Sequence, residues 1–135
     1  MASKIFEDFE NDDGSVTRYR KHMNGRGRIA STATVDPSAF IAPTAYVEDG
    51  ATIAKAVTIG AGSWVEKDAV VGAGCVIGAN VSIGEDARLG VHVKVGSHAR
   101  IGAGAKVGAG ALIAGDAIVP DGGEVLGRTA YQRAA

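Results

Sequence analysis

An aliphatic side chain returns at every sixth position of this chain between residues 29 and 125. Seventeen consecutive positions follow the rule without an insertion: Ile29, Val35, Ile41, Val47, Ile53, Ile59, Val65, Val71, Ile77, Ile83, Leu89, Val95, Ile101, Val107, Ile113, Val119 and Val125. A helix repeats about every 3.6 residues and a plain strand every two, so neither explains this spacing. The pattern therefore predicts a repeat architecture in which each six-residue unit, or hexad, adds the same piece of backbone.

The other positions of the hexad indicate a short strand followed by a tight corner. We number each hexad from its aliphatic residue. The fifth position is small or β-branched almost throughout, and it precedes the next aliphatic residue by two, so both side chains point to the same side of a strand. The fourth position holds residues that tolerate a positive φ, namely Gly50, Gly62, Asp68, Gly74, Asn80, Asp86, His92, His98, Gly104, Gly110, Asp116 and Gly122. We therefore place the corner at the third and fourth positions.

The hexads VIGANV, IGEDAR and IGAGAK resemble the repeat of the bacterial transferase hexapeptide superfamily, [LIV]-[GAED]-x-x-[STAV]-x, and the resemblance covers residues 29 to about 130. It implies three hexads per coil and an all-β, single-domain, left-handed parallel β-helix of five to six triangular coils. We expect an N-terminal cap over residues 1–28, with a β-hairpin around the segment ENDDG. The β-helix is expected over residues 29–130 and a C-terminal tail over residues 131–135.

The amino-acid composition limits which binding partners and which cellular compartment we expect. Fourteen basic and fifteen acidic side chains leave a net charge of −1, which favours neither nucleic acid nor a membrane surface as a partner. The first residues, MASKIFEDFENDDG, carry acids where a signal peptide needs an apolar run, and no segment is long enough to cross a bilayer. We expect a cytoplasmic protein. Cys75, the single cysteine, occupies a fifth hexad position and is expected to be a buried structural thiol.

With eighteen residues per coil, the outward side chains form one column on each of three faces. The most apolar column contains Phe40, Thr58, Val76, Lys94 and Leu112. The resemblance implies a parallel homotrimer, and we expect this face to form its contact because exposed apolar strips usually mark interfaces. On a second face, Tyr46 and Trp64 lie one coil apart and form an aromatic ladder, a further contact or a platform for a ring-shaped ligand.

The resemblance also implies an activity: transfer of an acyl group from acyl-CoA or acyl carrier protein to a hydroxyl or an amine, in a cleft between subunits, with a histidine as general base. His98 is the candidate base, Asp116 lies one coil away in the same corner column and would orient it, and His92 would approach from across the cleft. Both histidines equally suit a corner that needs a positive φ.

Four cations follow one another in the outward positions of the fourth and fifth coils. Lys94, Arg100 and Lys106 are the candidates for binding the phosphates of the acyl donor. The same belt, which begins at Arg88, equally suits a surface that keeps exposed strands of different molecules apart. We expect no tightly bound cofactor and no metal.

Two other functions remain open from the sequence. The hexads run without the protruding loop that acyltransferases of the superfamily usually carry, which favours a non-catalytic, rigid trimeric scaffold, including a component of a phage or surface assembly. A metal site like that of the gamma-class carbonic anhydrases is the weaker alternative. Such a site needs three histidines per zinc, and outside the cap, which contains His22, the chain has only His92 and His98.

Overall fold

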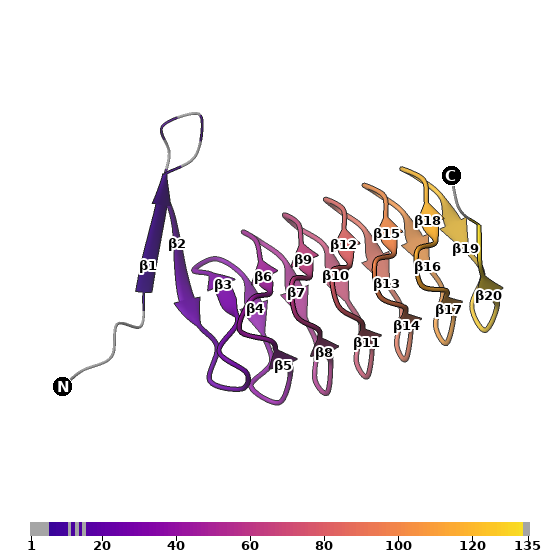
Figure 1. Cartoon of the computed structure of the whole chain (residues 1–135), viewed down its shortest axis with the longest axis horizontal. Helices are drawn as coiled ribbons and strands as arrows, with labels where there is room; N and C mark the ends of the chain where they lie inside the picture. The colour runs from indigo at the N-terminus through magenta and orange to yellow at the C-terminus, as the bar shows by residue number, and fades with distance from the viewer. Residues whose placement is uncertain (1–5, 11, 13, 15, 134–135) are drawn as a thin grey trace.

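A computed structural model describes residues 6–10, 12, 14 and 16–133, with side chains from residue 10 onward. The chain folds into a parallel β-helix of about six turns, and an N-terminal hairpin adjoins its first coil (Figure 1). In the described part of the chain, no helix is long and apolar enough to cross a membrane. The three faces of the β-helix are three sheets, which we call sheets A, B and C.

Each sheet takes one short strand from every coil. Sheet A has the order β1 (Phe6–Glu10), β2 (Val16–Lys21), β3 (Arg28–Ala30), β6 (Tyr46–Val47), β9 (Trp64–Val65), β12 (Ser82–Ile83), β15 (Arg100–Ile101) and β18 (Ile118–Val119). Sheet B contains β4 (Thr34–Val35), β7 (Thr52–Ile53), β10 (Val70–Val71), β13 (Arg88–Leu89), β16 (Lys106–Val107) and β19 (Glu124–Val125). Sheet C contains β5 (Phe40–Ile41), β8 (Thr58–Ile59), β11 (Val76–Ile77), β14 (Lys94–Val95), β17 (Leu112–Ile113) and β20 (Ala130–Tyr131).

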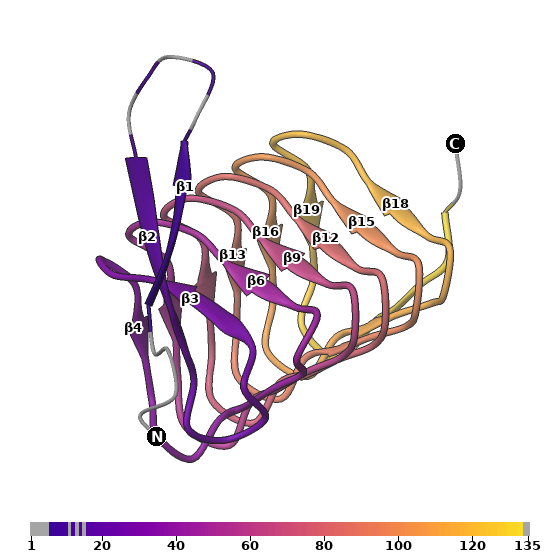
Figure 2. The ribbon, with the colours of Figure 1, turned by 60° about the vertical axis from the view of Figure 1, so that its left-hand side comes forward.

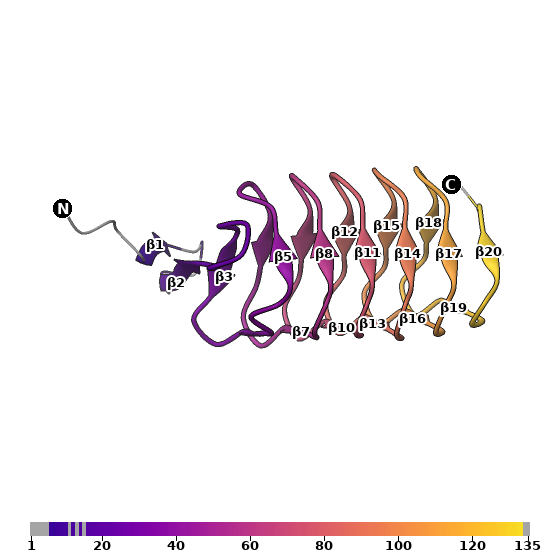
Figure 3. The ribbon, with the colours of Figure 1, turned by 90° about the horizontal axis from the view of Figure 1, so that it is seen from below.

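The strand register confirms the coil of eighteen residues. In sheet C, Val76 pairs in parallel with Lys94, and Lys94 pairs with Leu112. Figure 3 shows the strands of this sheet side by side along the molecule. The predicted outward columns are therefore real, with one column on each sheet.

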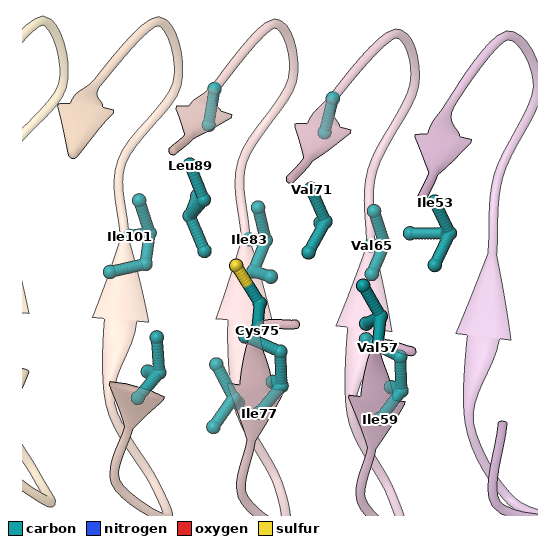
Figure 4. Packing of buried hydrophobic residues seen from close by; sticks show 14 of the residues in the cluster. Ile53, Val57, Ile59, Val65, Val71, Cys75, Ile77, Ile83, Leu89 and Ile101 are labelled. Carbon is teal, nitrogen blue, oxygen red and sulfur yellow. The ribbon is translucent and has the colours of Figure 1, made fainter. Parts of the chain in front are cut away.

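The interior is built from the two inward positions of each hexad. All seventeen aliphatic residues at the first position are buried, and so is the fifth position in every hexad from Ala33 to Ala117. Figure 4 shows the aliphatic side chains filling the space between the sheets, with Cys75 among them. The Cys75 thiol is fully buried and donates a hydrogen bond to the carbonyl of Gly90 at 3.0 Å. The prediction of a buried structural thiol is confirmed.

The corners adopt the conformation that the fourth hexad position predicts. All twelve predicted residues have a positive φ, between 56° and 74°. Ala56 and Arg128 occupy the same hexad position and also have a positive φ, although neither residue favours that conformation. The repeat geometry therefore overrides local preference at these two corners.

The first coil turns its corners in a different way. Thr32, Ser38 and Thr44 occupy the fourth position there, and their φ is not positive. Their hydroxyls instead accept hydrogen bonds of 3.1, 3.0 and 2.9 Å from the backbone N–H groups of the residues eighteen positions later. In later coils the equivalent N–H donates to a backbone carbonyl, as from Asp68 to Asp49 at 3.0 Å. Hydroxyl side chains thus replace a backbone acceptor at the start of the β-helix.

The N-terminal segment covers two edges of the first coil. Strands β1 and β2 pair antiparallel, and β2 pairs antiparallel with β3, so the hairpin extends sheet A (Figure 2). The loop that follows covers the edge strand of sheet C, because Ile41 donates to the carbonyl of Asn24 and Gly27 donates to the carbonyl of Ile41. At Gly25, where φ is +100°, a Cβ would clash with the carbonyl oxygen of Ile41. The predicted turn ENDDG lies partly outside the described residues.

Candidate functional site

His98 lies at the corner between β14 and β15, where sheet C meets sheet A. Its side chain is exposed and its φ is +66°. The backbone N–H of His98 donates to Ala79, and that of Asp116 donates to Ser97 at 3.0 Å, which stacks the corners of Asn80, His98 and Asp116 on successive coils. No side-chain hydrogen bond joins His98 to another residue of the described chain. The imidazole is thus available to a ligand.

His92 occupies the preceding corner, between β13 and β14. It is also exposed, and its imidazole lies over Gly74, where a Cβ would clash with Nδ1 of the ring. His92 and His98 therefore flank strand β14 on the two margins of sheet C. Within one chain they stand at different corners of the same coil, so a pair formed by these two imidazoles requires a second copy of the chain.

The three candidate phosphate-binding cations lie on three different faces. Lys94 projects from sheet C, Arg100 from sheet A and Lys106 from sheet B, and all three are exposed. The structure does not bring them together within one chain. A single ligand would contact more than one of them only where faces of two copies meet.

Sheet C carries a shallow groove beside the histidine corners. Its volume is about 480 Å³. Lys94, Val76 and Leu112 stand on this face, and Gly78, Gly96 and Ala114 leave room for the groove because their side chains are small or absent. The exposed fractions of Phe40, Val76 and Leu112 are 41%, 43% and 49%. This is the face on which the sequence places the trimer contact.

Sheet A carries an aromatic cluster near the hairpin. The rings of Tyr46 and Trp64 stack with centroids 4.7 Å apart and planes inclined by 16°. Tyr19 of β2 packs edge-on against Tyr46, with centroids 5.5 Å apart. The sequence singles out the Tyr46 and Trp64 pair but not Tyr19, because the hairpin has no repeat that would place its side chains on a column.

Two carboxylates accompany the rings. Glu48 is buried and accepts a hydrogen bond of 2.6 Å from the hydroxyl of Tyr19. Glu66, one coil further, is half-buried, and its pKa is raised by burial and then by the charges of Glu48 and Glu85. A second groove, of about 380 Å³, begins one strand beyond Trp64, over Ser82 and Arg100.

The described side chains favour neither a reactive cysteine nor a metal site. Burial raises the pKa of Cys75, which makes it a poor nucleophile. Nowhere in the described part of the chain do three His, Cys, Asp or Glu side chains gather as a metal site requires. His22 is buried in the N-terminal segment, where Nε2 lies 2.8 Å from the carbonyl oxygen of Ala39.

Comparison with known proteins identifies the class. Residues 56–90 and 80–115 match the family model described as bacterial transferase hexapeptide (six repeats). The perosamine N-acetyltransferase of Caulobacter crescentus, solved with CoA and GDP-perosamine, is 33% identical over 77% of this chain, with a TM-score of 0.74. A hexapeptide transferase family protein from Anaplasma phagocytophilum is 22% identical over 76% of the chain and covers 67% of its own length, with a TM-score of 0.55. No curated protein matches the sequence.

These findings confirm the resemblance seen in the repeats. The repeats of this chain match those of the bacterial transferase hexapeptide family, and its fold is the left-handed parallel β-helix expected from the sequence. It spans 50% of the length of the Caulobacter enzyme.

Proposed function

We propose that this chain transfers an acyl group from an acyl-CoA to an amine or a hydroxyl of a sugar acceptor. The supporting observation is the likeness, at 33% identity and a TM-score of 0.74, to an N-acetyltransferase solved with CoA and GDP-perosamine. An exposed histidine corner beside an apolar groove fits the same chemistry. Acyl carrier protein is the alternative donor.

The reaction needs one proton acceptor and one proton donor, and His98 serves as both. Its neutral imidazole takes a proton from the acceptor amine or hydroxyl as the nitrogen or oxygen attacks the thioester carbonyl. The carbon–sulfur bond then breaks, and the imidazolium returns the proton to the departing CoA thiolate. Asp116, one coil away, is a positioning residue whose carboxylate favours the charged imidazolium.

The proposed active unit is a homotrimer packed through sheet C. Its exposed apolar residues Phe40, Val76 and Leu112 would be covered in the contact. Packing of this kind brings His98 of one copy toward His92 of the next. It also places cations of two copies, among them Lys94, around one cleft, where they bind the donor's phosphates.

A binding and turnover experiment tests the proposal. Acetyl-CoA should raise the thermal midpoint of the protein, and release of free CoA should depend on an amino-sugar nucleotide. His98→Asn keeps a residue that tolerates a positive φ, so the fold and CoA binding should remain while turnover falls by about 10²–10⁴. The proposal fails if no acyl donor shifts the midpoint, or if His98→Asn retains full turnover. Sedimentation velocity checks the trimer independently.

A rigid trimeric scaffold is the second candidate. The observation in its favour is the regularity of the coils, since strands recur every six residues from β4 to β20 without a protruding loop. Function usually depends on loops that a rigid scaffold carries. A stable trimer that responds to neither CoA nor a sugar nucleotide would support this candidate over the enzyme.

A further inference from the structure

The ladder of rings on sheet A leaves one indole face open. Tyr46 and Trp64 stack at 4.7 Å, close to the spacing of about 4.8 Å between neighbouring strands. On the other side of Trp64, the paired residue is Ser82 of β12, the strand that follows β9 along the sheet (Figure 2). A serine is too short to cover an indole ring. Trp64 consequently keeps 42% of its surface exposed, and its open face looks along the sheet over Ser82.

Polar groups surround this open face without engaging one another. The indole N–H of Trp64, the hydroxyl of Ser82, the guanidinium of Arg100 and the carboxylate of Glu66 form no hydrogen bond or ion pair with the described part of the chain. Glu66 is half-buried beside the charges of Glu48 and Glu85, which raise its pKa, so the fold gains little from a carboxylate at this position. These groups are available to a ligand.

The spacing of the strands suits a flat ring. Arg100 pairs with Ser82 in the same column, so Trp64 and Arg100 stand two strands apart, about 9.6 Å. A ring halfway between them would lie about 4.8 Å from each, within stacking range of the indole and within cation–π range of the guanidinium. Ser82 and Gly84 form the floor, where the 380 Å³ groove begins.

The side chains of Arg100 and Glu66 determine which kind of ring-shaped ligand binds best in this space. A guanidinium stacks well on an aromatic ring and poorly on a pyranose, which favours a nucleobase over a sugar. Glu66 accepts hydrogen bonds and offers none when it is ionised. Guanine presents two neighbouring donors, N1–H and the N2 amino group, on one edge. Adenine and cytosine place an acceptor next to their amino group on the equivalent edge, and that acceptor repels a carboxylate.

We infer that sheet A carries a guanine-binding subsite, in which the base stacks on Trp64 over Ser82, donates through N1–H and N2–H to Glu66 and is covered by Arg100. The inference rests on the proposed function, because it assigns the acceptor sugar to the guanine nucleotides. The Trp64 column lies near the corner that carries Asn80 and His98, and Glu66 lies toward the opposite margin of sheet A. A guanine with its donor edge at Glu66 therefore directs N9, and with it the ribose and phosphates, toward His98.

The fluorescence of Trp64 tests the subsite directly, because it is the only tryptophan in the chain. GDP should quench it in a saturable manner, and ADP and UDP should bind at least about tenfold more weakly. Glu66→Gln should weaken GDP binding by at least about tenfold and remove the preference for guanine. Ser82→Tyr, which extends the ladder with a protein ring, should abolish quenching, whereas Thr52→Tyr at an equivalent outward position of sheet B should not.

Several results would overturn the subsite. It is wrong if GDP fails to quench Trp64, if UDP or a free amino sugar binds as well as GDP, or if Glu66→Gln binds GDP normally. A change of oligomeric state in Ser82→Tyr without any response to GDP would assign this face to a contact between copies. The assay contains no acyl donor, so acyl transfer without quenching refutes only the subsite, and quenching by GDP without any response to CoA refutes only the proposed transferase.

Discussion

Tyr19 of strand β2 donates a hydrogen bond of 2.6 Å to Oε1 of Glu48, and this bond ties the N-terminal hairpin to the second coil. Both side chains are buried, with 7% and 8% of their surfaces exposed. Tyr19→Phe removes the donor and leaves a buried carboxylate with one partner fewer. We expect a loss of about 1–3 kcal/mol in the free energy of unfolding, measured by denaturant titration.

The same bond should make stability depend on alkaline pH. Burial, and then the hydrogen bond that its hydroxyl donates to Glu48, raise the pKa of Tyr19 above its ordinary value of 10.0. A raised pKa stabilises the folded state fully below pH 10, and this contribution declines as the pH rises further, because only the unfolded chain releases the proton. The advantage of the natural protein over Tyr19→Phe should shrink by about 1.4 kcal/mol per pH unit above pH 10. An advantage that stays constant from pH 8 to pH 11 would contradict this coupling.

The phase of the repeat can be tested with two neighbouring alanines. Ala105 is fully buried at a fifth hexad position, and Ala103 is exposed at a corner. Ala105→Glu forces a carboxylate among aliphatic side chains, at a cost of several kcal/mol, and should prevent folding. Ala103→Glu keeps its charge in water, and its free energy of unfolding should stay within about 0.5 kcal/mol of that of the natural protein. Circular dichroism and thermal unfolding distinguish the two, and equal behaviour would contradict the assigned phase.

Much of the β-helix follows from the sequence because its contacts repeat. An inward side chain such as Val95 pairs with the residues eighteen positions before and after it, here Ile77 and Ile113. The same relation holds from coil to coil, so one hexad pattern fixes the register of all three sheets. The same regularity allowed the inward positions and twelve of the positive-φ corners to be predicted residue by residue.

Features outside the repeat could not be placed in this way. Tyr19 contacts Glu48 across 29 positions, and no periodicity links the hairpin to a particular column of sheet A. The repeat determines the predicted catalytic corner only in part. The eighteen-residue period places His98 and Asp116 on successive coils, but it does not determine their side-chain rotamers. Whether His98 meets His92 depends on the packing of a second copy, which the sequence of one chain does not determine. The catalytic assignment remains a prediction.

Ala56 offers a test of strain at the corners. Its φ of 59° places an alanine in the left-handed region, which costs a non-glycine residue about 1–2 kcal/mol. Ala56→Gly should therefore raise the free energy of unfolding, by about 0.5–1 kcal/mol once the added freedom of the unfolded chain is subtracted. Ala61 serves as the matched control, because it is an exposed corner residue without a positive φ. Ala61→Gly should lower stability by a similar amount, since glycine there only adds freedom to the unfolded chain.

Glu66 should reveal a conflict between stability and binding. Burial, together with the charges of Glu48 and Glu85, raises the pKa of its carboxyl above the ordinary 4.5. A raised pKa means that the folded state favours the protonated carboxyl. Glu66 therefore stabilises the protein below about pH 4.5, and this contribution is lost as the pH rises. Glu66→Gln carries no charge at any pH. It should therefore be more stable than the natural protein at pH 7, by less than about 1 kcal/mol because Glu66 is partly solvated.

The gain from Glu66→Gln should disappear near pH 4, where the natural carboxyl is also neutral in the folded state. Glu124→Gln, on the exposed end of sheet B, is the control and should change little at either pH. The measurement is the thermal midpoint from pH 4 to pH 8 for all three proteins, in low salt, which preserves the repulsion between the carboxylates. A variant that is less stable than the natural protein at pH 7 would show that the carboxylate at position 66 supports the fold. A variant that is more stable at pH 7 and binds GDP more weakly would show that Glu66 is kept for the ligand rather than for the fold.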